Sequence, residues 1–412
     1  MKKRTAKLLL SMLVAGHAVG AMAGEPPPDA AAPVVPAAAP ESASDAVDLH
    51  ADWTQFVSAA VAGDGDSAPR YGGRVDIYAR IDAEKLGLWD GLAFNLQAET
   101  VYGRSTNRIG SSLLLPVNAA LSVPANDDEA FDLSYSVIQK IGQVRIQAGK
   151  INLLDASAAI PIVAGGGKVG FSHIGLAAPP GLLASPKVLG AVVSAPVGGI
   201  VLNAGAWSPQ NFTRRYGIGD AFDDGVNGWF AAVVPTRVGG RRGFHTFSIY
   251  LTNRRVNGRE DYPDIRPPPG TSGLLPTKAG GTQLRYAVQQ YLWQDPADPR
   301  RGWGFFGHVG VSTGAPGILD WSMTAGIAGT VPAAARPHDR FGIGYFRFSL
   351  ADRLVDGLAP VLPVGDEQGG ELYYTAQIGK RVAVTGYGQI VDPVIKGAST
   401  AVYLGLRVKT DF

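Results

Sequence analysis

Cysteine is absent from this chain of 412 residues, and charged residues make up only 17% of it. Without cysteine there is no disulfide framework, no thiolate chemistry and no lipid-modified N-terminal cysteine. Beyond the N-terminal segment, no stretch reaches the ~18 uninterrupted apolar residues that a membrane-spanning helix needs. Yet 46% of the residues are hydrophobic, and 54 are glycine. This combination predicts either a large soluble β protein or a β-barrel embedded in an outer membrane.

The first 23 residues have the pattern of a secretory signal peptide. An apolar run from Leu8 to about Val19 is followed by Ala21-Met22-Ala23, a small-x-small cleavage site. The basic tip consists of Lys2, Lys3, Arg4 and Lys7. Removing residues 1–23 leaves 33 of 37 basic residues and all 35 acidic ones, a net charge of −2. A chain with this charge balance is not expected to bind nucleic acid.

Residues 24–50 are dominated by proline and alanine, as in "GEPPPDAAAPVVPAAAPESASDAV". Such a composition has no apolar face to bury, so it predicts an extended periplasmic linker. We therefore expect the folded domain to comprise residues 51–412.

Strict alternation of apolar and polar residues recurs throughout residues 51–412 and predicts strands with one apolar and one polar face. In "GGRVDIYARID", one parity is Val75, Ile77, Ala79 and Ile81, and the other is Arg74, Asp76, Tyr78, Arg80 and Asp82. The C-terminal "STAVYLGLRVKTDF" alternates in the same way. We expect strands at 52–61, 72–82, 91–102, 131–140, 143–150, 189–196, 199–207, 228–235, 244–253, 281–293, 302–312, 321–331, 339–349, 370–379, 381–391 and 400–412.

The connections between these segments alternate between short and mostly longer ones. Outer-membrane barrels have short periplasmic turns, long extracellular loops and an even number of strands, whereas a soluble sandwich or lectin has no reason to sort its loops by parity. We therefore predict an all-β, transmembrane, antiparallel barrel of sixteen strands. Phe412 falls on the lipid-facing parity at the rim, and a C-terminal Phe resembles the signal that the barrel assembly machinery recognises.

A barrel of this size leaves an aqueous channel, so a passive, cofactor-free diffusion pore is the leading hypothesis. We expect the connection 151–188 to fold inward. The candidate pore-lining residues are Arg74, Asp76, Tyr78, Arg80, Glu99, Arg145, Lys150, Asp155, Lys168 and Trp293. Charged side chains among them suit sugar hydroxyls, and the rings of Tyr78 or Trp293 suit apolar sugar faces.

Two stretches resemble the carbohydrate-selective porins of the OprB type. In residues 147–209 the shared features are Gly149-Lys150, an N-x-x-D loop start at Asn152 and Asp155, Gly170-Phe171, and a proline-rich "LAAPPGLL" before Leu189. "DRFGIGYFRFSLADRL" (339–354) resembles a late strand and loop of that family. The resemblance implies a sixteen-stranded sugar channel in the outer membrane of a Gram-negative bacterium, in contact with lipid and lipopolysaccharide, as a monomer or homotrimer. A porin for small organic acids is the alternative.

Other chemistries have weaker support. "GGGKVG" (165–170) lacks the first glycine and the Ser or Thr of a phosphate-binding loop. "DGDS" (64–67) and "GDAFDDGVNG" (219–228) lack the ligand spacing of a calcium loop. The histidines are scattered and no nucleophile elbow accompanies them, so we do not expect an enzyme, although a barrel enzyme with a Ser/His/Asp site remains a hypothesis.

Overall fold

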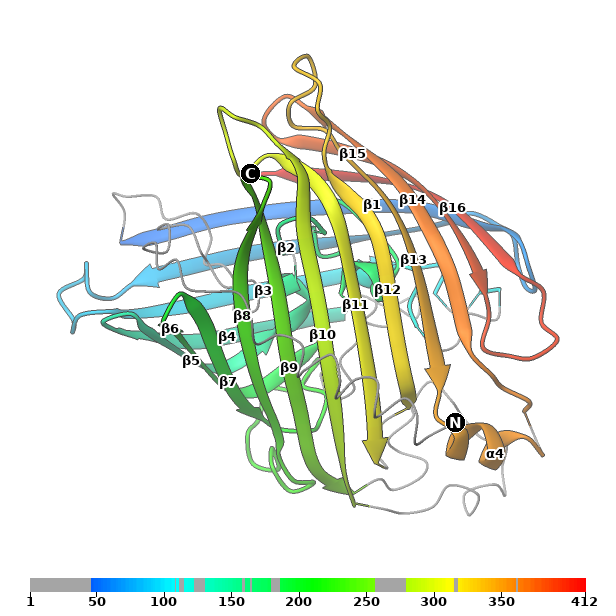
Figure 1. The fold of residues 1–412 in the computed structure, drawn as a ribbon, viewed down its shortest axis with the longest axis horizontal. Helices are drawn as coiled ribbons and strands as arrows, with labels where there is room; N and C mark the ends of the chain where they lie inside the picture. The colour runs from blue at the N-terminus through cyan, green and yellow to red at the C-terminus, as the bar shows by residue number, and fades with distance from the viewer. Residues whose placement is uncertain are drawn as a thin grey trace. The chain divides into compact units, whose positions relative to one another are not determined.

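The computed structural model describes residues 46–107, 109–110, 115–121, 130–157, 160–163, 165–178, 186–255, 279–314, 318–360 and 362–412. Sixteen strands form one closed antiparallel barrel in which each strand pairs with its neighbours in sequence and β1 pairs with β16 (Figure 1). The strands are β1 Val47–Ala62, β2 Arg70–Asp82, β3 Leu92–Gly103, β4 Ala130–Ile141, β5 Val144–Asn152, β6 Lys187–Val197, β7 Ile200–Trp207, β8 Asn227–Val238, β9 Arg241–Arg255, β10 Ala279–Gln294, β11 Gly302–Gly314, β12 Leu319–Thr330, β13 Arg340–Leu350, β14 Glu367–Ile378, β15 Val382–Asp392 and β16 Ala401–Asp411.

The predicted fold class is confirmed, and each expected strand overlaps one of the sixteen. The largest difference is at β1, which begins at Val47 rather than at residue 52. Residues 47–50 were expected in the linker, but they pair with β2, from Val47 opposite Ile81 to His50 opposite Tyr78. The pattern supports this earlier start, because the alternation continues backwards from residue 52.

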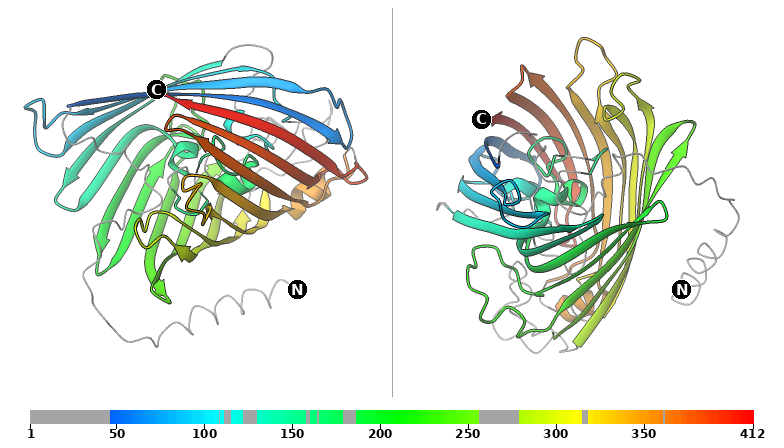
Figure 2. Two further views of the ribbon diagram at one scale, coloured as in Figure 1. Left: turned by 90° about the horizontal axis from the view of Figure 1, so that it is seen from above. Right: turned by 90° about the vertical axis from the view of Figure 1, so that its left-hand side faces the viewer.

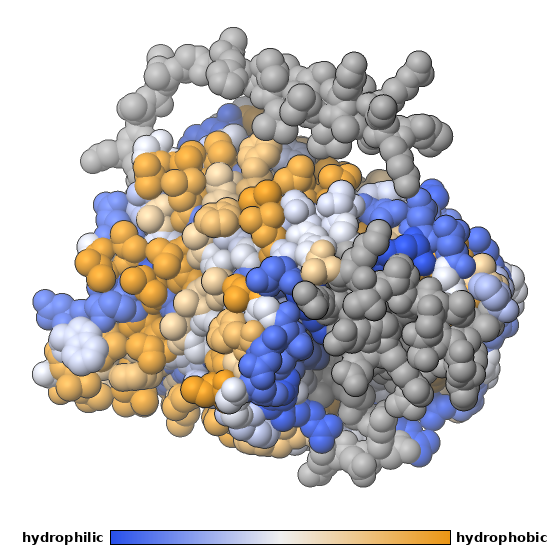
Figure 3. Space-filling model, turned by 90° about the horizontal axis from the view of Figure 1, so that it is seen from below, coloured by the Kyte–Doolittle hydropathy of each residue, from blue (hydrophilic) through white to orange (hydrophobic). Residues whose placement is uncertain are grey.

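The two parities face opposite sides of the barrel wall, as the alternation predicts. In β16, Leu404 and Leu406 are 54% and 48% exposed, whereas Arg407 is fully buried. Outward apolar side chains of this kind match the hydrocarbon part of a bilayer. Figure 3 shows apolar side chains covering much of the described surface in that view, with hydrophilic ones in separate patches among them and at the edges.

The longest connections all lie at one end of the barrel, although some connections at that end are short. One end has connections of at most nine residues: 83–91, 142–143, 198–199, 239–240, 295–301, 331–339 and 379–381. The other end has 63–69, 104–129, 153–186, 208–226, 256–278, 315–318, 351–366 and 393–400. In Figure 2, β1 and β16 lie side by side where the barrel closes, and Phe412 follows β16 at the end with short connections.

Part of the connection between β5 and β6 lies inside the barrel. It contains the short helices α2 (Leu153–Ser157) and α3 (Ile174–Ala177), which appear in teal within the ring of strands in Figure 2. A one-turn 3₁₀ helix, Ala119–Leu121, follows β3, and α4 (Asp352–Leu358) follows β13. In the part of the chain that the structure describes, no helix is long and apolar enough to cross a membrane.

Glycines on the barrel wall make room for aromatic rings of neighbouring strands. Gly405 of β16 lies directly opposite Tyr387 of β15, and a Cβ added to this glycine would overlap the tyrosine ring. The ring cannot shift freely, because the Arg407 guanidinium lies 5.2 Å from its centroid. Gly342 and Tyr373 are related in the same way. Glycine in these strands thus has a packing role.

We predict that Gly405→Ala destabilises the barrel by about 1–3 kcal/mol, because the added methyl group overpacks the Tyr387 ring. Gly386→Ala is the matched control, since nothing lies within 4 Å of a Cβ built at Gly386. A folded barrel and a boiled, unfolded chain migrate differently on a gel. The urea concentration at which the folded migration is lost measures the stability of each variant. Equal midpoints for the two variants would contradict the packing role of Gly405.

Candidate functional site

A row of carboxylates crosses five adjacent strands at one level of the lumen. The register places Asp52 of β1 opposite Asp411 of β16 and Asp76 of β2. Asp76 in turn lies opposite Glu99 of β3, which lies opposite Asp132 of β4. Like charges directly opposite each other destabilise a sheet. We call these five residues the carboxylate row, and its existence requires nearby cations.

Arg74 of β2 supplies the first of these cations. Its Nε lies 2.6 Å from Asp76, and one Nη lies 2.8 Å from Glu99 and 3.2 Å from Asp155 at the start of the β5–β6 connection. Arg74 is 2% exposed, so these interactions are made away from bulk water. Because a buried charge is costly unless it is paired, the guanidinium and its three carboxylates depend on one another.

Two lysines neutralise the far end of the carboxylate row. Lys187 of β6 lies 3.1 Å from Glu99 and 2.7 Å from Asp132. Lys150 of β5 also pairs with Asp132, and its Nζ donates a hydrogen bond to the Arg215 carbonyl at 2.9 Å. Each of these lysines is buried. In the β3–β6 part of the wall, the negative charges of the carboxylates are thereby balanced by the positive charges of the lysines.

A further cation, which pairs with Asp52 and Asp76 of the carboxylate row, comes from inside the lumen. Lys168 belongs to residues 165–178 of the β5–β6 connection, which we call the luminal segment. Its Nζ lies 2.8 Å from Asp52 and 2.7 Å from Asp76, and it donates to the Tyr78 hydroxyl at 2.7 Å. Burial alone would lower the pKa of Lys168, but the adjacent carboxylates, Asp76 foremost, raise that pKa well above its usual value.

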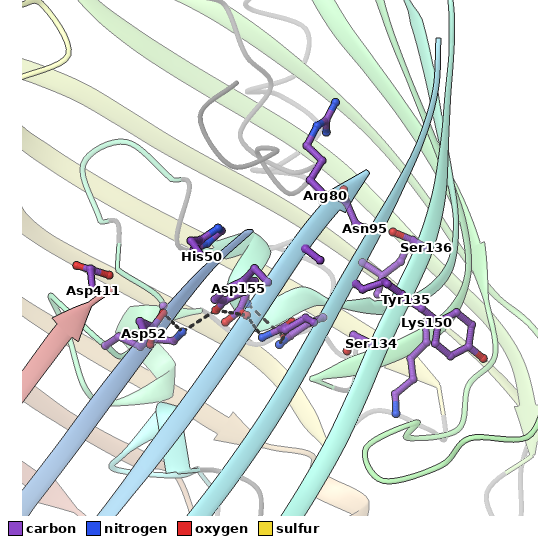
Figure 4. A pocket seen from close by; sticks show the side chains of 18 of the residues that line it. His50, Asp52, Arg80, Asn95, Ser134, Tyr135, Ser136, Lys150, Asp155 and Asp411 are labelled. Atoms are coloured by element: carbon purple, nitrogen blue, oxygen red, sulfur yellow. Dashed lines mark hydrogen bonds and ion pairs between the residues drawn. The ribbon is translucent and has the colours of Figure 1, made fainter. Parts of the chain in front are cut away.

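A cavity of about 460 Å³ lies between this wall and the luminal segment. In Figure 4, dashed lines mark the ion pairs and hydrogen bonds around Asp52 and Asp155, and the Arg80 side chain points away from these two residues. Hydroxyl and amide groups line the same cavity, and the His50 and Tyr78 rings stack at 4.5 Å on its β1–β2 side. The lining includes His50, Asp52, Tyr78, Arg80, Asn95, Gln97, Ser134, Tyr135, Ser136, Gln147, Lys150, Asn152, Asp155, Gly165, Gly166, Lys168, Val169, Arg340, Lys409 and Asp411.

Most residues predicted from the sequence gather in this region. Five line the cavity: Tyr78, Arg80, Lys150, Asp155 and Lys168. Three others, Arg74, Asp76 and Glu99, lie within the ion-pair network behind it. Arg145 is half-buried on β5 and donates to Gln147 at 3.0 Å.

Trp293 is placed elsewhere. It lies opposite Trp303 of β11, and a bulge between Tyr291 and Trp293 shifts the register. Trp303 has the same parity as Phe305, which is 39% exposed on the outer wall. Since directly opposite residues share a face, Trp293 is on the outward face rather than toward the lumen.

The sequence interpretation did not nominate several residues of the site. His50 was missed because its strand begins earlier than expected. Asp52 was the first residue of the expected strand 52–61 and was not nominated. Lys409 and Asp411 were assigned to the polar parity of the last strand, but nothing in the sequence showed that this strand brings them beside Asp52. Asn95 has the same parity as Glu99, so the alternation placed it on the polar face of its strand, but it was not nominated.

The motifs set aside on sequence grounds have partners in the structure. Asp64 of the "DGDS" stretch accepts hydrogen bonds from the Ser399 backbone N–H and hydroxyl at 3.0 and 2.9 Å. Asp220 of the 219–228 stretch pairs with Arg215. In the "GGGKVG" stretch, the lysine is bound to carboxylates. Within the described ranges, no three His, Cys, Asp or Glu side chains form a group able to hold a metal ion.

A closed barrel of sixteen strands with a polar lumen narrowed by its own connection is the architecture of an outer-membrane porin. The chain belongs to the carbohydrate-selective porin, OprB family, because the model of that family matches residues 66–412. Porins of this kind reside in the outer membrane of Gram-negative bacteria.

Solved structures agree on the fold. The high-pH structure of Pseudomonas putida OprB has a TM-score of 0.73 and 17% identity, covering 89% of this chain and 94% of that one. The low-pH structure of the same protein has a TM-score of 0.50 and 15% identity, with 89% and 93% covered. Pseudomonas aeruginosa OccK2 (OpdF) has a TM-score of 0.50 and 11% identity, with 89% and 97% covered. No curated protein matches the chain.

We predict that Lys168→Met makes the pore more selective for cations. The substitution removes the ammonium group nearest to Asp52, whose remaining partner Lys409 lies 3.9 Å away. The reversal potential in a KCl gradient should shift toward the potassium potential. Lys85→Met, an equal charge change on the exposed 83–91 connection, is the control and should leave the reversal potential in place. Equal values for both variants would place Lys168 outside the conduction path.

A second prediction concerns His173 of the luminal segment. Burial lowers the pKa of His173 to about 3, against about 6.5 in an unfolded chain. The unfolded state therefore binds a proton first as the pH falls, so stability decreases between about pH 6.5 and pH 3. The loss at pH 5 should be on the order of 1–2 kcal/mol.

His173→Asn tests this prediction, because Asn does not titrate there and retains an acceptor for the Gly175 N–H, which His173 Nδ1 accepts at 3.1 Å. Urea unfolding midpoints at pH 7 and pH 5 should differ more in the original protein than in the variant. The same pH dependence in both proteins would show that His173 does not cause it.

Proposed function

We propose that this porin is a passive diffusion channel for small neutral sugars of the size of glucose. One observation carries the proposal: the cavity of about 460 Å³ combines a charge-compensated wall with amide and hydroxyl side chains. Sugar hydroxyls both donate and accept hydrogen bonds, so they match paired charges and amides without needing an opposite ionic charge. Pore width, donors, acceptors and charge together set the selectivity of such a constriction.

Specific groups around the cavity suit a sugar. Asn95 and Gln147 offer amides that donate and accept, and Ser136 offers a hydroxyl. The stacked His50 and Tyr78 rings provide an aromatic surface beside them. We infer that a sugar crosses here, and that Arg145, which donates to Gln147, influences the passage indirectly.

Small organic acids form the second candidate class. The cationic residues lining the cavity are Arg80, Lys150, Lys168, Arg340 and Lys409, and the acidic ones are Asp52, Asp155 and Asp411. This excess of cations favours an anionic solute. The wall behind the cavity adds the carboxylates Asp76, Glu99 and Asp132 and the cations Arg74 and Lys187, so it offsets part of the excess. For this reason we place neutral sugars first.

The proposal also covers how the protein reaches the outer membrane. Residues 1–23 direct export and are then removed, and residues 24–46 form a periplasmic linker before β1. Phe412, which is 65% exposed after β16, provides the recognition signal for the barrel assembly machinery. The outer wall then contacts lipid and lipopolysaccharide, either as a monomer or between copies in a homotrimer.

Liposome swelling with refolded protein tests the substrate class. We expect fast swelling in glucose, slower swelling in a disaccharide and poor swelling in an organic anion of the size of glucose, because the wall is compensated. Preference for the anion would overturn the sugar assignment in favour of the organic acids. Boiled protein that has lost its folded gel mobility is the control for leakage.

A further inference from the structure

The luminal segment is held to the barrel wall through its backbone by two buried side chains of opposite charge. Glu371 of β14 is 2% exposed and Arg407 of β16 is fully buried. Neither side chain is part of the cavity lining. Their role must therefore be argued from what they hold and not from contact with a solute.

Glu371 binds two consecutive N–H groups of the luminal segment. Its Oε1 accepts from the Ser172 N–H at 2.6 Å, and its Oε2 accepts from the His173 N–H at 2.7 Å. The Gln389 side-chain amide donates to Oε2 at 3.1 Å. Each oxygen of this carboxyl group therefore accepts a hydrogen bond from the backbone of the segment. Two such bonds from adjacent residues fix both the position and the orientation of the chain.

Arg407 binds the opposite kind of backbone group a few residues earlier. Its two terminal nitrogens donate to the carbonyls of Gly167 and Gly170. These carbonyls flank Lys168, whose ammonium group lies between Asp52 and Asp76. The glycines make the arrangement possible, because Gly167 and Gly170 have φ of 82° and 111°, values that other residues rarely adopt.

An apolar anchor lies between these two polar ones. Phe171 packs edge-on against Phe306 at 5.5 Å and Tyr373 at 4.8 Å between ring centroids. Just before the luminal segment, the Ile162 carbonyl accepts a hydrogen bond from the Arg340 guanidinium at 3.1 Å. The attachment therefore joins the connection to β11, β13, β14 and β16, whereas Lys168 joins it to β1 and β2.

We propose that Glu371 and Arg407 are positioning residues that set the size limit of the pore. By fixing residues 167–173 through backbone groups, they hold Lys168 and Val169 at the edge of the cavity. The inference rests on the proposed channel function, but it concerns the position of the luminal segment and not the choice of solute. Loss of either anchor lets the segment move and widens the passage.

Glu371→Gln tests the first anchor, because an amide has only one acceptor oxygen for the two N–H groups. Thr385→Val is the matched control. Thr385 is fully buried, lies opposite Arg407 in the sheet, and bonds to Thr375 at 2.8 Å. Single-channel conductance with poly(ethylene glycol)s of increasing size measures the pore width without depending on sugar recognition. We expect larger conductance and a larger exclusion size in Glu371→Gln alone.

A spin label reports the position of the segment directly. Because the chain contains no cysteine, Val169→Cys gives a single labelling site at the cavity edge. We expect an immobilised spectrum in the otherwise unchanged protein and a mobile one when Glu371→Gln is added. If that variant does not form a heat-modifiable barrel, Arg407→Lys replaces it, since lysine keeps the charge but lacks the forked donor geometry that reaches both carbonyls.

The outcomes separate the two proposals. Unchanged exclusion size and an immobile label in a folded Glu371→Gln or Arg407→Lys barrel would overturn the positioning role. A pore that excludes glucose but still widens in these variants would support the positioning role and refute the sugar assignment.

Discussion

In a bilayer, each unpaired backbone N–H or C=O costs several kcal/mol, so strands can cross only when every one of them has two paired neighbours. Here that requirement is met by pairing β1 with β16, from Asp52 opposite Asp411 to Ala62 opposite Val402. Closure fixes which parity faces the lumen on every strand. It also fixes the register, and the register alone brings Asp52, Asp76 and Glu99 to one level.

The carboxylate row then constrains the connections. Aligned carboxylates are tolerated only beside cations, and the wall itself provides Arg74, Lys150 and Lys187. Asp52 and Asp76 receive their remaining ammonium group from Lys168, which is not on a strand. The charge balance of the wall and the inward position of the luminal segment are therefore coupled. The buried Lys168 and the buried carboxylates Asp52 and Asp76 each need the other's charge to be stable.

Period-two alternation was sufficient to predict the strands and the inward parity of Arg74, Asp76 and Glu99, because it depends only on local geometry. It did not reveal that these side chains pair with one another, since pairing depends on the register between strands. Trp293 shows a second limit: one extra residue at a bulge reverses the face, and no local signal marks it. Contacts such as Glu371 with Ser172 join residues far apart in sequence, beyond the reach of any pattern.

The two ways of holding the luminal segment have different consequences for selectivity. Lys168 contributes a side chain to the cavity, so changing it alters the charge that a solute meets. Glu371 and Arg407 bind the luminal segment through its backbone groups, so these bonds do not involve the side chains that the segment presents to the pore. Pore width and pore chemistry are thus assigned to separate residues. Because none of these anchoring bonds involves the Val169 side chain, substitutions at that cavity-lining position can change the solute preference while the constriction stays in place.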